Sequence, residues 1–249
     1  MTHVSDDIYL GSVGVGAQPA LGGPLWPGPS PSGYGFGPMG RVYIWDIVPI
    51  ALSATGICLA QAIAAAGNAV INGARAVVQG DGTTVAVLDY DRRVTFVSSG
   101  AGDTTQTITV TGTDRYGQPL SWAGLATGTT PVVIPKTFKT VTRIASSAAL
   151  AGNLSVGFND AFGLPVFIAD AGYVLSTKWA GAADVGTFVA GVATAPSTTT
   201  GDVRGVYTPS SVADGVKRLV MAIAMTGAQV GPDATRESLA GKNQNLYVA

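Results

Sequence analysis

Polar and apolar residues alternate along most of this chain, and the clearest case is the stretch Thr105–Ile144. Threonine occupies every second position in Thr105–Thr113, which is the side-chain period of a β-strand. Asp114–Pro119 then supplies the Asp, Gly and Pro residues of a turn. Alternation resumes in Lys136–Ile144. The pattern predicts a β-meander with nothing catalytic in it.

The flanking segments have the same character, and we expect strands there as well. These are Arg41–Ile50, Arg75–Val78, Thr84–Leu88, Arg93–Val97, Asn153–Gly157, Tyr173–Trp179, Thr187–Thr194, Val203–Tyr207 and Lys217–Thr226. Asp81-Gly82 predicts a hairpin between the second and third of them. Strands and turns at a spacing of roughly 8–12 residues, without alternating helices, predict an all-β fold. We expect an antiparallel β-sandwich or a jelly-roll-like barrel.

One segment, Leu52–Ile71, has an ambiguous pattern. Cys58–Ala66 is rich in residues that favour helices, and Gly67-Asn68 would end such a helix. The ten residues between Gly56 and Gly67 are nevertheless marginal for an isolated helix. We therefore favour two short strands joined by a loop near residues 64–68.

The first 40 residues differ from the rest because Gly and Pro crowd them. Such a segment supports neither a helix nor a central strand, and two interpretations are a disordered tail and an extended arm. Aromatic residues favour the arm, since disordered linkers are usually poor in them. The arm would dock on a neighbouring subunit or on its own domain. Its candidate interaction residues are Trp26, Tyr34, Phe36 and Met39.

The expected domain organisation follows from these patterns. Residues 1–40 form the Gly/Pro-rich arm and residues 41–229 form a β domain, or two β subdomains with a break near 145–160. Residues 230–249 form a C-terminal tail, with a short helix around Ala234–Ala240 as an alternative. The most apolar window, Ile47–Val78, is interrupted by polar residues and Pro49, so we expect no membrane span.

Composition narrows the class of protein. The chain of 249 residues has 34 Gly, 14 Asp and a single Glu, and its net charge is −1. Charged residues make up 12% and the mean hydropathy is +0.34, which suits a protein that buries its surface against copies or partners. No basic block is present, so we expect no nucleic-acid partner.

Residues with catalytic potential are few. His3 is the sole histidine, which argues against Ser-His-Asp or Cys-His nucleophiles and against most zinc and iron sites. Cys58 lies in an apolar run, and we interpret it as a small core residue. Asp89 and Asp91 form the most suggestive carboxylate pair, and we interpret them as charged turn residues. We expect no enzyme activity, no cofactor and no metal.

The predicted turn after the threonine-rich strand carries a cation and an aromatic residue, Arg115 and Tyr116. The simpler interpretation is a hairpin tip whose groups are satisfied. The alternative is a recognition loop, so both residues join the candidate interaction residues.

Several segments resemble virion structural proteins of tailed double-stranded DNA bacteriophages. They are Thr107–Pro119, Lys139–Thr142, Asn153–Gly157, Phe162–Pro165 and Gly201–Ser210. The resemblance spans about Arg41–Met225, and its motifs are typical in combination rather than singly. It implies a β-rich component of the particle, such as a decoration, cement or neck protein, and it assigns no functional residue.

Three functions remain as expectations. The first is a capsid decoration or cement protein on the head surface, acting as a dimer or trimer that bridges major capsid or other virion proteins. The second is a tail, neck or head-fibre component that contacts the host surface. The third is a glycan-acting enzyme that uses paired Asp residues, which the single Glu and the scattered acids argue against.

Overall fold

The computed structural model describes residues 5–6, 41–168, 170–192 and 197–225. In this part of the chain, two compact units can be distinguished. The first unit consists of residues 5–6, 41–48, 170–184 and 217–225, and the second of residues 49–168, 185–192 and 197–216. Both units are built from antiparallel strands, so the expected all-β fold is confirmed.

The first unit contains a small sheet whose strand order is β1-β2-β15-β11-β12. Its elements are β1 (Ser5–Asp6), β2 (Arg41–Ile47), the short 3-10 helix η2 (Ala171–Tyr173), β11 (Val174–Trp179), β12 (Ala182–Ala183) and β15 (Leu219–Met225). Trp45 on β2 pairs in register with Met221 on β15. Both side chains are buried, so this pair lies in the core of the unit.

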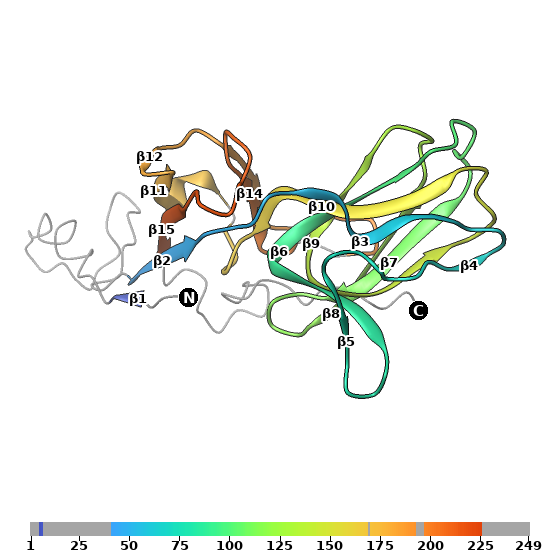
Figure 1. The fold of residues 1–249 in the computed structure, drawn as a ribbon. Coiled ribbons are helices and arrows are strands. Elements are labelled where there is room, and N and C mark those ends of the chain that lie inside the picture. Colours follow the sequence, from blue (N-terminus) through green and yellow to red (C-terminus); the bar gives the residue numbers. More distant parts are fainter. Residues whose placement is uncertain (1–4, 7–40, 169, 193–196, 226–249) are drawn as a thin grey trace, which may run out of the picture. The chain divides into compact units, whose positions relative to one another are not determined.

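The second unit contains the larger sheet (Figure 1). Its strands are β3 (Ser53–Ala62), β4 (Gly67–Asn68), β5 (Ala76–Val78), β6 (Thr84–Ser98), β7 (Thr107–Thr113), β8 (Pro119–Leu125), β9 (Val132–Ser146), β10 (Asn153–Gly163), β13 (Thr187–Ala190) and β14 (Gly205–Thr208). The main order is β13-β14-β10-β6-β9-β7-β8, with β3 on β10, β4 on β9 and β5 on β6. The sheet curls into a sandwich or half-barrel.

The core of the second unit lies inside this curl. Alternate residues of β7 are buried, so the threonines of the sequence pattern share one face while Ile108 and Val110 enter the core. The long strands β6, β9 and β10 contribute large core side chains, among them Phe96, Phe138 and Phe158. The period of two seen in the sequence therefore separates the two faces of the sheet.

The stretch Thr105–Ile144 forms three strands as predicted, but the meander is wrong. In a meander β8 would lie between β7 and β9, whereas here β7 pairs with both β8 and β9. The reason is that β9 pairs with two strands, with β6 through Val132–Val141 and with β7 through Thr140–Ser146. β8 consequently lies at an edge, where the missing N–H of Pro119 costs no ladder bond.

Two expected strands, Thr84–Leu88 and Arg93–Val97, are joined in the structure as the single strand β6. The residues between them were interpreted as a turn because they are charged, and that interpretation is wrong. No Gly or Pro interrupts Thr84–Ser98, so the backbone remains extended through a bulge.

The strand interpretation of Leu52–Ile71 is correct. β3 pairs with β10 along its length, and Ile57 and Cys58 are buried in the core. Tertiary packing thus outweighs the helix propensity of the alanine-rich stretch. The second strand is wrong in position, because β4 comprises only Gly67–Asn68, inside the expected loop, and Ala69–Ile71 lie in no strand.

The division into units does not coincide with the break that was considered near residues 145–160, because β9 and β10 on either side of it belong to the same sheet. The arm (1–40, apart from β1), the tail (230–249) and the possible helix Ala234–Ala240 lie outside the described residues. Within the described ranges, no helix is both long and apolar enough to span a membrane.

The close approach of β3 to β10 generates a testable prediction. A Cβ atom placed on Gly157 would lie 1.9 Å from the carbonyl oxygen of Ser53, so Gly157→Ala must push the two backbones apart. Overpacking of this kind costs about 1–3 kcal/mol of unfolding free energy. Denaturant unfolding should show a loss in this range.

Gly67→Ala is the matched control, because a Cβ there has no neighbour within 4 Å. Equal stability of the two variants would contradict the close approach of β3 to β10.

Candidate functional site

The charged side chains of the second unit gather mainly in its interior. Those that are buried are Asp91, Arg92, Asp103, Asp114, Lys136, Asp160, Asp202 and Arg204. Among the described residues of this unit, the exposed charged residues are Asp81, Arg143 and Asp214. A buried charge is costly unless it is paired and hydrogen-bonded, so the geometry of this interior network is the first place to seek a function.

Three β-bulges carry several of these groups. On β6, the five-residue step from Val87 to Arg92 faces a two-residue step on β9, and this bulge carries Asp89 and Asp91. On β10, the step from Phe158 to Phe162 faces only two residues of β6. Bulges re-aim side chains in this way.

The second of these bulges, on β10, carries Asp160. A third lies on β9, where the four residues from Val133 to Thr137 face a two-residue step on β6. It carries Lys136. The three bulges lie on three neighbouring strands, so they bring charged side chains together that are far apart in the sequence.

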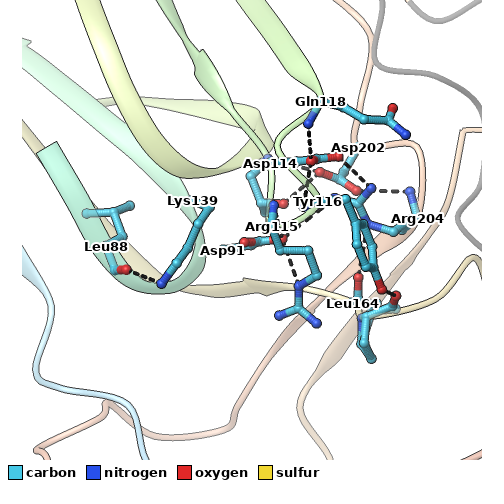
Figure 2. A network of polar contacts seen from close by, with 12 residues as sticks. Leu88, Asp91, Asp114, Arg115, Tyr116, Gln118, Lys139, Leu164, Asp202 and Arg204 are labelled. Carbon is cyan, nitrogen blue, oxygen red and sulfur yellow. Dashed lines mark hydrogen bonds and ion pairs between the residues drawn. The ribbon is translucent and has the colours of Figure 1, made fainter. Parts of the chain in front are cut away.

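Arg204, just before β14, is the cation at the centre of one half of the network (Figure 2). Its Nη1 lies 2.8 Å from Asp114 Oδ2 and its Nη2 lies 3.6 Å from Asp91 Oδ2. Its Nε donates to the Leu164 carbonyl at 3.2 Å, and the guanidinium lies 5.2 Å from the centre of the Tyr116 ring. Burial acts to lower the pKa of Arg204, but the surrounding carboxylates outweigh it and raise that pKa.

The β7–β8 hairpin tip docks on this centre. Asp114 Oδ1 accepts hydrogen bonds from the backbone N–H groups of Tyr116 and Gln118 at 2.8 and 2.9 Å, and Gly117 closes the turn with a φ of +74°. Arg115 Nε lies 3.0 Å from Asp91 Oδ2, and the Tyr116 hydroxyl donates to the Pro165 carbonyl. The tip is thus satisfied, as the simpler interpretation predicted.

Asp202 ties Arg204 to β9. Its Oδ2 accepts hydrogen bonds from the Thr137 N–H and hydroxyl at 3.1 and 2.6 Å, and its Oδ1 accepts from the Arg204 N–H at 2.9 Å. Its charge also acts on Lys136. Burial lowers the pKa of the Lys136 ammonium and Asp202 partly opposes that shift.

Arg92 is the second central cation. Its Nη2 lies 2.6 Å from Asp89 Oδ2 and its Nη1 lies 3.2 Å from Asp160 Oδ1. The guanidinium also lies 4.9 Å from the ring centres of Phe158 and Phe162. Arg92 Nη2 donates in addition to the Ile50 carbonyl at 2.6 Å. Arg92 therefore binds the start of the unit, β6 and β10 to one another.

Asp91 illustrates the energetic cost of burying a carboxylate in this network. Burial raises the pKa of the Asp91 carboxyl, while the charges of Arg115 and Arg204 act in the opposite direction. Lys139 lies nearby and donates to the Leu88 and Asp89 carbonyls at 2.5 and 2.9 Å. The charges of Arg115 and Arg204 thus favour the ionised form of Asp91, but burial outweighs them and the pKa is raised.

Lys136, whose lowered pKa would suit a nucleophile or base, has no exposed surface and cannot meet a substrate from solvent in this conformation. In the described ranges, no three His, Cys, Asp or Glu side chains come together as they would around a metal ion.

The outcome for the residues singled out from the sequence is mixed. Arg115 and Tyr116 lie together at the hairpin tip, whereas Trp26, Tyr34, Phe36, Met39 and His3 lie outside the described residues. Cys58 is a buried free thiol whose pKa is raised by burial. The interpretation of Asp89 and Asp91 as turn residues is wrong, because both lie within β6.

Sequence reasoning also missed Arg92, Asp160, Asp202 and Arg204. For Arg92 a signal was present, since the charged run Asp89–Arg93 lies in an extended stretch without turn residues. For the other three, the partners are 40 to 90 residues away along the chain, and periodicity carries no such information.

A smaller buried carboxylate, Asp103, organises the loops at the other end of β6. Its Oδ1 accepts from the Ala151 N–H at 2.8 Å and its Oδ2 from the Gly152 N–H at 3.0 Å, and the Ser98 hydroxyl also donates to it. These hydrogen bonds, the one from Ser98 foremost, lower the pKa of Asp103.

Comparison of the chain with known protein families, with curated proteins and with solved structures finds no match.

The burial of Arg204 predicts a large loss of stability in Arg204→Met. Methionine keeps most of the side-chain volume but removes the cation that lies 2.8 Å from Asp114, and it leaves Asp91 with Arg115 alone. Breaking a buried pair by removing one partner costs about 3–5 kcal/mol. Denaturant unfolding measures the loss, and Arg143→Met in the same unit serves as the control.

Arg143 is exposed, so its replacement should cost no more than about 1 kcal/mol. If Arg204→Met were as mild as Arg143→Met, the network would contribute little to the fold.

The low pKa of Asp103 predicts a loss of stability in acid. A carboxyl whose pKa is depressed in the folded state contributes stability that is present above its unfolded pKa of about 3.9 and is lost as pH falls through its folded pKa. Asp103→Asn removes this linkage. Urea unfolding between about pH 5 and pH 2 should therefore give a shallower pH dependence for Asp103→Asn than for the wild type; identical slopes would contradict the assignment.

Proposed function

We propose that the protein is a structural component of a virus particle, a capsid decoration or cement protein of a tailed double-stranded DNA bacteriophage. In this role it acts by binding, not by catalysis, and it stabilises the head by bridging capsid subunits. Its partners are other copies of itself, as a dimer or trimer, and the major capsid protein. The proposal draws first on the resemblance of the segments quoted above.

The observation that carries the proposal is the distribution of charge in the second unit. Soluble monomers usually keep their surfaces charged and free of apolar patches. Here the described residues of the unit expose only Asp81, Arg143 and Asp214 among their charged side chains, while the others are buried or half-buried. A surface with so few exposed charges suits a protein that functions in contact with other subunits.

A second candidate, a tail, neck or head-fibre component, is favoured by the hairpin tip. The Tyr116 side chain is half exposed, although its hydroxyl is bound to Pro165 and its ring packs on Arg204. A rigid, exposed tyrosine offers contact area at a low cost in side-chain entropy. Such a residue at the end of a hairpin suits contact with a host surface.

Labelling of particles tests the proposal. Intact phage particles that carry this chain are purified and bound with an antibody raised against it, and electron micrographs locate the label. We expect label over the head, at many sites per particle. Label confined to the tail, neck or fibres would favour the second candidate. Purified particles that lack the chain by mass spectrometry would overturn both.

A further inference from the structure

The dipeptide Asn72-Gly73 occurs once in the chain, and it has a chemistry of its own. The backbone nitrogen of a glycine attacks the side-chain carbonyl carbon of a preceding asparagine more readily than that of any other residue, because glycine has no side chain in the way and the freest backbone. Asn72 is exposed, so water reaches its side chain, whereas Gly73 is buried. The reactivity of the pair therefore depends on how the fold holds the Gly73 nitrogen.

The fold requires both residues of this pair. From β4 the chain turns back and runs beside β3 (Figure 1), and we call Ala69–Arg75 the return segment. The Leu59 N–H on β3 donates to Asn72 Oδ1 at 2.8 Å, so the asparagine side chain anchors the segment. A Cβ atom placed on Gly73 would lie 2.4 Å from the Thr55 carbonyl oxygen. Packing against β3 thus retains a reactive sequence at this position.

The same packing holds the reacting nitrogen. The Gly73 N–H donates to the Ile57 carbonyl at 3.0 Å. To attack the Asn72 side chain, the nitrogen must first lose its proton to base, which is also the chemical step of amide hydrogen exchange. A buried, hydrogen-bonded N–H loses its proton only after the structure around it opens. In the closed structure the bond to Ile57 therefore blocks the reaction.

The hydrogen bonds that keep the return segment in place are largely at the surface. The Gln61 side-chain amide donates to the Val70 carbonyl at 2.8 Å and accepts from the Val70 N–H at 2.9 Å. These two bonds and the bond from Leu59 to Asn72 are solvent-exposed. Segments held by exposed hydrogen bonds open at a lower free energy than core strands, so we expect the return segment to open without unfolding of the sheet.

We propose that Asn72-Gly73 is a deamidation site that the fold keeps closed and that local opening of the return segment exposes. The Gly73 nitrogen bonds to Asn72 Cγ, and the side-chain nitrogen leaves as ammonia with the proton taken from Gly73. Water then opens the resulting succinimide ring at either carbonyl carbon, which gives aspartate or isoaspartate. The net change exchanges ammonia for water and needs no other reactant.

The modification makes the opening irreversible. Either product places a negative charge in Pro49–Ala74, a stretch that has no charged residue. Isoaspartate also lengthens the backbone by one atom, which moves Gly73 out of register with Ile57. The inference is independent of the proposed virion role.

Comparison of the folded and unfolded chain tests the site. The full chain is incubated in mildly alkaline buffer with and without guanidinium chloride, and peptide mapping by mass spectrometry follows conversion of the Asn72 amide to the acid. We expect conversion in denaturant and a rate at least about 10-fold lower in the folded chain. Asn72→Gln is the control for the site, because its longer side chain forms the ring far less readily. Equal rates in both states, or no conversion in denaturant, would overturn the proposal.

Substitution of Gln61 tests the local opening. Gln61→Ala removes both bonds to Val70 but leaves the reacting pair intact, so conversion in the folded chain should be at least about 3-fold faster than in the wild type, with an unchanged rate in denaturant. Gln106→Ala is the matched control, since the Gln106 side chain donates to the Ala149 carbonyl at 3.1 Å, outside the return segment. Circular dichroism verifies that each variant is folded. Equal acceleration in both variants, or none in Gln61→Ala, would reject local opening as the gate.

Gln61→Glu is a milder second variant that keeps the test decisive if Gln61→Ala does not fold. Its carboxylate still accepts from the Val70 N–H but has no donor for the Val70 carbonyl. Conversion in the folded chain should then be faster than in the wild type and slower than in Gln61→Ala. A folded Gln61→Glu that converts no faster than the wild type would likewise overturn the proposal.

Discussion

Two buried arginines, Arg92 and Arg204, set the condition that the rest of the second unit meets. Each side chain has no exposed surface, and an unpaired guanidinium there would be prohibitively costly. Carboxylates must therefore reach both of them inside the sheet. The bulges on β6 and β10 carry Asp89, Asp91 and Asp160. Asp114 and Asp202 are the other carboxylates near these arginines. The bulges therefore help to place negative charges beside the buried arginines.

This interior arrangement has a consequence at the surface. Ion pairs and hydrogen bonds join three segments near Arg204: the hairpin tip, the segment at Leu164–Pro165 and the loop before β14. The loops at the other end of β6 are held by Asp103, and apolar side chains pack in the core. Charge that would ordinarily keep a surface soluble lies inside instead. The described residues of the second unit therefore expose few charged side chains.

The sequence was sufficient for the class of fold and for most strands, because the alternation of Thr with Ile and Val around Ile108 and Val110 is a local property. It also favoured strand over helix at Cys58, correctly. It misplaced β9, since pairing with β6 and β7 together is a long-range property, and it misjudged Asp89 and Asp91, since charge in a strand resembles charge in a turn. Partners as distant as Asp114 and Arg204 leave no periodic signal at all.

Hydrogen exchange tests most directly the claim that the network is an integral part of the folded unit. The N–H groups of Tyr116 and Gln118 are bonded to the Asp114 carboxylate, at a hairpin tip that would ordinarily open locally. If the network holds the tip, these N–H groups exchange only by global unfolding, with the same free energy of opening as core amides of β6. Exchange of both groups at a much lower free energy, while the β6 amides stay protected, would contradict the account.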